Sequence, residues 1–234
     1  MYDDLLKAVE DGKVTIVVMI DLRAAFDTID IPIALYILHE DFVIDDTPLQ
    51  WIRSYLTDRT MKVIINNKTS EEENLLFGVP QGSCAGPVIF TLYIAALNRV
   101  VQNYPVQLHG YADDHKVAVQ IQAGNIENMT YALEQLSSCL ADISVWMEKY
   151  KLKMNNVKTE IILYGTTQQL AKVDLSGINV GGCYVKCVDH VRDLGVLFDA
   201  YLNFDRHIRK KVSDCLLPIE ELEIYSLLSI TEVN

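Results

Sequence analysis

The sequence is short of positive charge. Its 234 residues include 20 Lys and Arg against 32 Asp and Glu, so the formal net charge is −12. Affinity for nucleic acid comes mainly from Lys and Arg side chains that neutralise phosphates, and the chain as a whole does not carry that charge. The basic residues are sparse, and the nearest candidates for a basic surface lie in two groups: Lys149, Lys151 and Lys153, and Arg206, Arg209, Lys210 and Lys211 with His207.

Long hydrophobic runs and a disulfide framework are also absent. No apolar stretch approaches the ~18–20 residues that a membrane span needs, and the first residues have no basic and apolar regions typical of a secretory signal. Five cysteines are an odd number without framework spacing, which is typical of a reducing compartment. We therefore expect an intracellular protein, nuclear or cytoplasmic, that is neither secreted nor bound to a membrane. The spacing of Cys183, Cys187 and His190 is not a usual zinc pattern.

Half of the residues are apolar, enough for one large domain or two small ones. Strand and helix patterns are mixed without a regular βαβ rhythm, which favours an α+β fold with a largely antiparallel sheet. Strands are predicted at 13–21, 61–66, 74–78, 152–154, 159–164, 178–180, 184–189 and 194–198, with a hairpin over 106–121. Helices are predicted at 32–39, 46–57, 86–102, 125–150 and 204–217. In the helix 125–150, apolar residues at helical spacing predict one buried stripe: Met129, Leu133, Leu136, Leu140, Ile143 and Met147.

The segment Tyr111-Ala112-Asp113-Asp114 carries two adjacent carboxylates between two segments of alternating apolar residues. This pattern predicts a β-hairpin with both carboxylates at its tip. Neighbouring carboxylates repel each other unless water or a cation neutralises them. Because Asp is also a common turn residue, a solvated acidic turn and a metal site both explain the hairpin.

A third carboxylate follows the nearly unbroken apolar run 14–20, which is typical of a strand buried on both faces. This strand ends on Asp21, and a carboxylate at the end of a buried strand is costly unless something pairs with it. If the strand and the hairpin are neighbours in one sheet, their carboxylates form a compact cluster of oxygen ligands. Hard cations such as Mg²⁺ prefer that chemistry, and two such ions can catalyse phosphoryl transfer.

Between these elements, residues 77–87 contain three glycines and two prolines and lead into an apolar helix. This composition predicts a rigid, tightly turned loop. An ordinary turn with Ser83 as the helix cap explains the pattern. Together with the carboxylates, the small side chains and the amide of Gln81 equally indicate a surface where a nucleotide or template base approaches the backbone.

These segments together resemble the reverse transcriptases of non-LTR, LINE-like retrotransposons, and more distantly those of group II introns and retroviruses. The resemblance covers roughly residues 5–210, with five motifs in the family's order. Residues 20–30 resemble motif A of the family, and residues 78–83, with Gly86, Pro87 and Phe90, resemble motif B. Residues 111–114 resemble motif C. Motif D is similar to residues 152–155, which lead into Lys158, Thr159 and Glu160, and motif E is similar to residues 190–196.

The resemblance implies a polymerase palm, in which an antiparallel sheet packs against helices, with partial fingers and no complete thumb. It implies a palm with partial fingers over 1–165, a palm continuation with a primer-grip-like hairpin over 166–211, and a diverged or truncated tail over 212–234. The chain is thus expected to be a palm-centred fragment that lacks fingers, thumb or endonuclease segments.

The resemblance also implies catalytic roles. Asp21, Asp113 and Asp114 would be the catalytic residues and the ligands of two Mg²⁺ ions, with Mn²⁺ able to substitute. The implied substrates are an RNA template with a DNA primer and deoxynucleoside triphosphates. The primer 3′-hydroxyl would attack the α-phosphate of the incoming nucleotide.

Further residues are assigned to binding on the same ground. Phe26, Gln81, Gly82 and Lys158 would bind the nucleotide, and the turn Leu194-Gly195 would grip the primer. The ring of Phe26 would exclude a 2′-hydroxyl, although a core aromatic would also fit its position. A lone Lys such as Lys158 is commonly just solvated.

The sequence therefore predicts an RNA-directed DNA polymerase domain, a nucleotidyltransferase that is weak or inactive as an isolated fragment. The alternative is a catalytically inactive palm remnant of a retroelement that serves as a folded or interaction domain. An RNA-templated RNA polymerase or a primase is disfavoured by Phe26 and by motif B. The net charge of −12 and the implied missing segments favour low activity of the chain alone.

Overall fold

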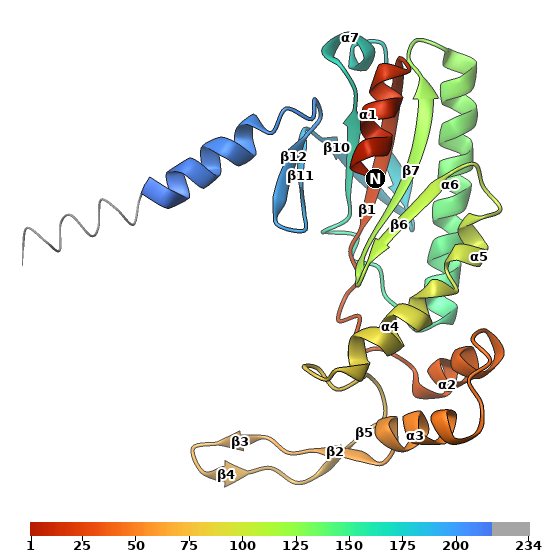
Figure 1. Ribbon diagram of the computed structural model, residues 1–234, viewed down its shortest axis with the longest axis vertical. Helices are drawn as coiled ribbons and strands as arrows, with labels where there is room; N and C mark the ends of the chain where they lie inside the picture. The colour runs from red at the N-terminus through yellow and green to blue at the C-terminus, as the bar shows by residue number, and fades with distance from the viewer. Residues whose placement is uncertain (217–234) are drawn as a thin grey trace, which may run out of the picture.

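The computed structural model describes residues 1–216 and has a six-stranded sheet at its centre (Figure 1). The strand order is β6-β7-β1-β8-β10-β9. In chain order these strands are β1 (Lys13–Ile20), β6 (Gln107–Tyr111), β7 (Asp114–Gln122), β8 (Glu160–Tyr164), β9 (Gly177–Val180) and β10 (Cys183–Val188). Neighbouring strands are antiparallel except β8 and β10, so the predicted α+β fold with a largely antiparallel sheet is confirmed.

Both faces of β1 are covered, which is why its sequence reads as an unbroken apolar run. On one face, Val14, Ile16 and Val18 share a buried cluster with residues of the long helix α6 (Ile126–Lys149). On the other face, Val17 packs with Leu5 of α1 (Tyr2–Glu10), a helix that the sequence pattern did not predict. Figure 1 shows α1 lying over the sheet and α6 running along its other side.

The helix predicted over 125–150 is confirmed as α6, and its predicted stripe is buried or packed against the core. The predicted helices 32–39 and 46–57 correspond to α2 (Ile31–Glu40) and α3 (Asp46–Leu56). A short helix, α7 (Thr167–Leu170), begins with a capping box made by Thr166 and Gln169 and was not predicted.

The single long helix predicted over 86–102 is wrong. The chain forms α4 (Ala85–Ala95) and α5 (Asn98–Val101), with a turn at Ala96 and Leu97. The Asn98 side chain donates to the carbonyl of Ala95 at 3.1 Å. Such a side-chain bond competes with the helical ladder, and the backbone N–H of Leu97 bonds three residues back, to Ile94.

The strand pair predicted at 61–66 and 74–78 forms two small ladders instead. β2 (Arg59–Met61) pairs with β5 (Glu73–Leu75), and β3 (Ile64–Ile65) pairs with β4 (Lys68–Thr69). Between the ladders, Ser70 bonds the backbone N–H of Val63 through its hydroxyl and the carbonyl of Val63 through its own N–H. This local pairing interrupts the strand and produces the arm seen at the bottom of Figure 1.

The predicted strand 152–154 is reduced to an isolated bridge between Met154 and Leu22, while the predicted 159–164, 178–180 and 184–189 correspond to β8, β9 and β10. The predicted strand 194–198 is wrong at its start. Residues 190–199 form a separate hairpin of β11 (His190–Asp193) and β12 (Val196–Asp199), with Leu194 and Gly195 in its turn. Both turn residues have positive φ, 45° and 84°, which excludes them from a strand.

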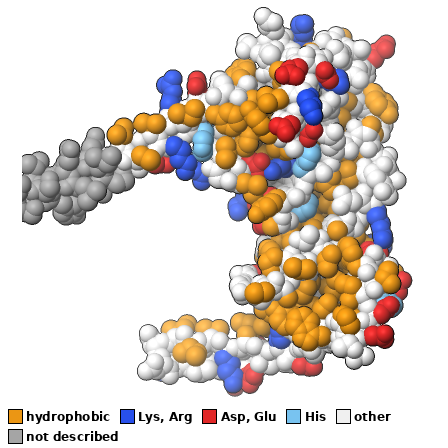
Figure 2. Space-filling view, viewed as in Figure 1, with side chains coloured by type: hydrophobic (Ala, Val, Ile, Leu, Met, Phe, Trp, Pro, Cys, Tyr) orange, Lys and Arg blue, Asp and Glu red, His pale blue; other side chains and the backbone are white. Residues whose placement is uncertain are grey.

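Residues 205–216 are helical, in agreement with the predicted helix 204–217 up to the last described residue. Most of the predicted tail 212–234 lies outside the described residues. Figure 2 shows the molecule hollowed between this helix and the arm of β2 to β5. Within residues 1–216, none of the helices has the length and apolar character needed to cross a membrane.

Candidate active site

Asp21 and Asp114 lie side by side at one end of the sheet. β1 and β7 are antiparallel neighbours, and the last pair in their register is Ile20 with His115. Asp21 follows Ile20 and Asp114 precedes His115, so the next position on each strand carries a carboxylate. The neighbouring strands that the sequence analysis required for a carboxylate cluster are therefore present.

Asp113 occupies the tip of the predicted hairpin. Tyr111 of β6 pairs with Asp114 of β7, which leaves Ala112 and Asp113 as the turn. Ala112 has a φ of 53°, a conformation that non-glycine residues rarely adopt and that two-residue hairpin turns demand. The turn thus holds Asp113 at the tip, half-buried like Asp114. The prediction that both carboxylates lie at the tip is wrong for Asp114, which is the first residue of β7 because it pairs with Tyr111.

The three carboxylates do not converge on one point. Among residues 1–216, no three His, Cys, Asp or Glu side chains are close enough together to hold a metal ion. The donor set nevertheless consists of carboxylate oxygens, which hard divalent cations prefer. The chemistry of the donors thus fits Mg²⁺, although the three side chains do not form one cluster.

Asp114 is surrounded by other carboxylates, which act on its pKa. Burial raises the pKa of Asp114, and the neighbouring Asp113 raises it further. Asp193 and Asp21 act in the same direction, while Lys116 opposes them. Placing a charged carboxylate here therefore costs stability, a cost that a bound cation would offset.

Asp21 is held by a hydrogen-bond network that the sequence analysis did not identify. The Asn155 side-chain amide donates to Asp21 Oδ2 at 2.8 Å, and the Asn155 backbone N–H donates to the Asp21 carbonyl at 2.8 Å. Arg23 Nε donates in turn to Asn155 Oδ1 at 3.3 Å. Asn155 was placed in motif D without a role, and its burial beside a carboxylate, which only the fold reveals, is the signal that identifies it.

A cavity of about 370 Å³ opens beside Asp21 and Asp114. Two basic side chains line it, Lys158 and Arg192, and Lys158 Nζ lies 4.0 Å from Asp21 Oδ2. The cavity is also lined by Met19, Ile20, His115, Val157 and Glu160. A cavity lined by both carboxylates and basic side chains can bind a ligand that consists of phosphates and a divalent cation, because the carboxylates bind the cation and the basic side chains bind the phosphates. Lys158 was predicted at this site, whereas no pattern in the sequence singled out Arg192 within motif E.

Phe26 lies on the turn after β1 and is half-buried. Its ring stacks on that of Phe90 in α4, with centroids 4.7 Å apart and an interplanar angle of 27°. Its carbonyl accepts a bond of 2.9 Å from the N–H of Val79 in the glycine-rich loop. The ring therefore has a core contact on one side and an open side, so both interpretations of Phe26 remain compatible with its position.

The glycine-rich loop is docked on the turn that carries Phe26. A Cβ at Gly78 would lie 2.9 Å from Asp27 Cα, so the close approach of the two backbones requires glycine there. The amide of Gln81 is exposed and donates to Asp27 Oδ1 at 2.8 Å. Gly82 has a φ of 76° and faces open space. Ser83 Oγ accepts from the Gly86 N–H at 3.0 Å, but the N-cap of α4 is Cys84, so the predicted cap is wrong by one residue.

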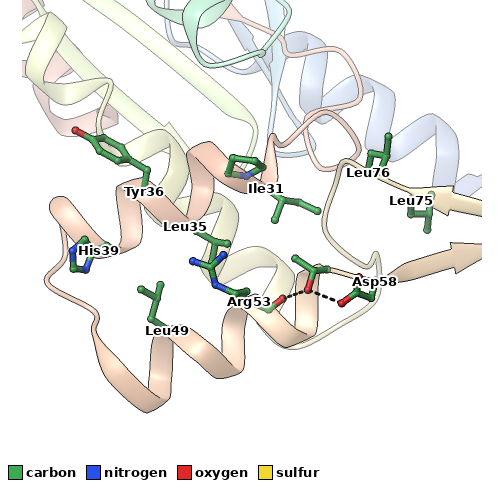
Figure 3. Close-up of a pocket in the computed structure, with 11 residues that line it drawn as sticks. Ile31, Leu35, Tyr36, His39, Leu49, Arg53, Asp58, Leu75 and Leu76 are labelled. Carbon is green, nitrogen blue, oxygen red and sulfur yellow. Dashed lines mark hydrogen bonds between the residues drawn. The ribbon is translucent and has the colours of Figure 1, made fainter.

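The predicted site residues thus fall into separate groups. Asp21, Asp114 and Lys158 line the cavity, whereas Asp113, Phe26, Gln81, Gly82 and the turn Leu194-Gly195 are not part of its lining. A larger, mainly apolar cavity of about 710 Å³ lies between α2, α3 and Leu75 and Leu76 (Figure 3). It contains no predicted site residue, and the carboxylates lie elsewhere, so we do not assign the chemistry to it.

A family model described as "Reverse transcriptase (RNA-dependent DNA polymerase)" matches residues 3–197. The chain belongs to the reverse transcriptase family. This confirms the resemblance on which the residue roles were predicted, and it accounts for the order of the carboxylates, the glycine-rich loop and the hairpins along the chain.

Relatives of this reverse transcriptase domain are proteins of mobile elements. The RNA-directed DNA polymerase from mobile element jockey of Drosophila melanogaster is 25% identical over 211 residues, which is 87% of this chain and 22% of that protein. The probable RNA-directed DNA polymerase from transposon BS of the same species is 25% identical over 93% of this chain and 24% of its own length. The chain therefore spans about a quarter of the length of these relatives.

Solved structures show the same fold. Apo telomerase from Candida tropicalis, truncated from its C-terminal domain, aligns with a TM-score of 0.56 at 13% identity, over 87% of this chain and 38% of that one. Telomerase from Candida albicans, solved in complex with a fragment of telomeric RNA, aligns with a TM-score of 0.53 at 14% identity, over 84% of this chain and 33% of that one. The palm-like reverse transcriptase fold is thus confirmed.

Proposed function

We propose that this chain holds the polymerase active site of a reverse transcriptase and adds deoxynucleotides to a primer 3′-hydroxyl on an RNA template. The observation that carries the proposal is the register of β1 and β7, which sets Asp21 beside Asp114 at the mouth of a cavity with Lys158 and Arg192. Carboxylates facing cations at one opening are the groups that phosphoryl transfer requires.

Asp21, Asp113 and Asp114 would hold two Mg²⁺ ions, for which Mn²⁺ could substitute. When bound, these ions activate the attacking oxygen and stabilise the leaving one. The donor chemistry supports this assignment, because all three side chains supply carboxylate oxygens.

The chain's own residues orient the reactants. Asn155 fixes Oδ2 of Asp21 through its amide, which leaves Oδ1 available to a ligand. Lys158 would bind the triphosphate of the incoming nucleotide, close to Asp21. The turn Leu194-Gly195, at the tip of the β11–β12 hairpin, would contact the primer.

Phe26, Gln81 and Gly82 would form the wall against which the nucleotide lies. The ring of Phe90 stacks on one face of the Phe26 ring, so the other face of the Phe26 ring could exclude a 2′-hydroxyl. Gln81 is held by Asp27, which keeps its amide oxygen free to accept a hydrogen bond. Gly82 offers no side chain, so a nucleotide or template base could approach its backbone.

A catalytically inactive palm remnant is the second candidate function. It is favoured by the net charge of −12, which disfavours binding to nucleic acid. Under the first proposal, fingers, thumb or endonuclease segments supplied by a longer protein would raise an activity that is weak in this chain alone. Either function would be exercised inside the cell, in the nucleus or the cytoplasm.

Primer extension on a primed RNA template, with Mg²⁺ and then Mn²⁺, tests the proposal. We expect deoxynucleotide incorporation by the wild-type chain and by Asp174→Ala, which removes an exposed carboxylate outside the site. Incorporation should be lost in Asp113→Ala. Equal incorporation by Asp113→Ala would refute the assignment of the carboxylates, and no incorporation by a folded wild-type chain would favour the remnant.

The same assay tests the role of Phe26. Phe26→Val leaves more space above Phe90, so we expect ribonucleotides to be incorporated more readily relative to deoxynucleotides. An unchanged ratio of the two kcat/KM values would show that Phe26 serves only the core.

A further inference from the structure

The β11–β12 hairpin has few backbone hydrogen bonds to the rest of the molecule. It forms its own two-stranded sheet, separate from the six-stranded one. The N–H of Gly165 bonds the carbonyl of Ala200 at 3.1 Å, just beyond β12. Within the described chain, no backbone hydrogen bond joins residues 190–197 to the six-stranded sheet.

One face of this hairpin packs against apolar side chains of the six-stranded sheet. Val191 is buried in a cluster with Val17, Ala118 and Ile162, and Phe198 packs against the same cluster. Such contacts have no directional preference, so they do not by themselves fix where the tip of the hairpin lies.

A buried ion pair lies close to that tip. Lys116 Nζ is 2.5 Å from Asp193 Oδ1, and each side chain is 8% exposed. In contrast, the side chains of the Lys62–Glu72 pair on the arm are 49% and 51% exposed. A charge is buried only where a partner compensates it, so each member of the Lys116–Asp193 pair keeps the other in place.

Lys116 and Asp193 connect the strand that carries Asp114 with the hairpin that carries Arg192. Lys116 follows Asp114 by two residues on β7, so the two side chains lie on the same face of the strand. Asp193 stands between Arg192, which lines the cavity, and Leu194. The pair thus bridges the strand of the carboxylates and the turn of the β11–β12 hairpin.

We propose that Lys116 and Asp193 are positioning residues that dock the tip of the β11–β12 hairpin onto β7. Two opposite charges that are both buried attract each other strongly and have no other partner, whereas apolar contacts can be exchanged for one another. It holds Arg192 at the cavity and keeps the turn Leu194-Gly195 at a constant distance from Asp114. When one partner is removed, the other charge is left buried, and the tip can move outward to hydrate it without breaking any strand pairing of the large sheet.

Hydrogen exchange of the backbone amides tests the docking directly. In Lys116→Met and in Asp193→Asn, we expect amides of residues 190–199 to exchange at least tenfold faster, while those of β1 and β7 keep their protection. The double variant Lys116→Met with Asp193→Leu leaves no buried charge and should return exchange toward the wild-type rate. Lys62→Met, which breaks the exposed pair on the arm, is the matched control and should change nothing in 190–199.

Two results would overturn the inference. One is unchanged exchange of residues 190–199 in both single variants. The other is an equal rise of exchange across all strands, which would make the pair a general contribution to stability. Asp193→Asn keeps the size of its side chain and covers the case in which Lys116→Met does not fold.

The consequence for catalysis rests on the proposed function and is measured separately. In the single variants we expect weaker binding of a primed template, a lower kcat of primer extension and a higher KM for the nucleotide, because Arg192 leaves the cavity together with the tip. If the wild-type chain extends no primer, the remnant is favoured over the proposed function, while the exchange result still decides the docking. If extension occurs but this pattern does not, the docking does not serve the primer.

Discussion

Replacing Asn155 should reveal how strongly the candidate active site depends on the bond to Asp21. Asn155 is 9% exposed, and its amide donates to Asp21 Oδ2 at 2.8 Å. Asn155→Leu has a similar volume and removes this bond, while the backbone bonds of residue 155 to Asp21 and Thr159 can remain. Hydrogen bonds to a charged group contribute about 1.5–3 kcal/mol. We therefore expect the free energy of unfolding to fall by about 2 kcal/mol.

Asn155→Asp is the sharper variant, because it keeps the shape and replaces the donor by a second carboxylate. Close to Asp21, the introduced carboxylate should have a raised pKa in the folded state. The loss of folding stability that the introduced carboxylate causes is absent below its pKa in the unfolded chain, about 3.9. This loss is complete above the raised pKa of the same group in the folded chain. The variant should thus be less stable than Asn155→Leu at pH 8 and should recover as the pH falls, because a protonated carboxyl can again donate to Asp21.

Urea unfolding followed by circular dichroism between pH 5 and pH 8 measures both effects, with unchanged m values as the check on two-state behaviour. Asn179→Leu changes an exposed residue of β9 and should stay within about 0.5 kcal/mol of wild type. If Asn155→Asp has wild-type stability at pH 8, or a loss that does not depend on pH, the bond from Asn155 does not hold Asp21 in place.

Three further variants test the packing and electrostatics of the site. Phe90→Ala removes a fully buried ring that supports Phe26, so urea unfolding should show a loss of about 3–5 kcal/mol, and a loss under 1 kcal/mol would contradict the packing. Asp114→Asn should raise the unfolding midpoint at pH 7, because burial and Asp113 raise the pKa of Asp114 and so penalise its charged form. This gain should vanish as calorimetric scans approach pH 4, and a lower midpoint at pH 7 would refute the reasoning. His115→Gln should be less sensitive to acid than wild type, because burial lowers the pKa of His115 and below about pH 6.5 the unfolded chain takes up a proton that the folded one does not. Parallel stability curves of the two proteins between pH 7 and pH 5 would show that His115 does not contribute.

The sequence by itself determined the features that depend on neighbouring residues. The apolar run before Asp21, the hairpin over 106–121 and the stripe of α6 are local patterns, and the structure confirms each of them, although only Asp113 and not Asp114 lies in the turn of the hairpin. The motifs also determined the family, because their order along the chain needs no knowledge of contacts. The same local reasoning was wrong at Asn98, whose side chain competes with the helix, and at the arm, where Ser70 changes the pairing.

Only the tertiary structure decided which distant residues meet. The bond from Asn155 to Asp21 and the burial of Lys116 against Asp193 join segments that are far apart in the sequence. In the sequence a buried lysine cannot be distinguished from a solvated one, since burial depends on the partner and not on the neighbours. The carboxylates were predictable as candidates because strands end on them. The register of β1 with β7 decides that Asp21 and Asp114 lie side by side, and the fold brings up the side chains that surround them.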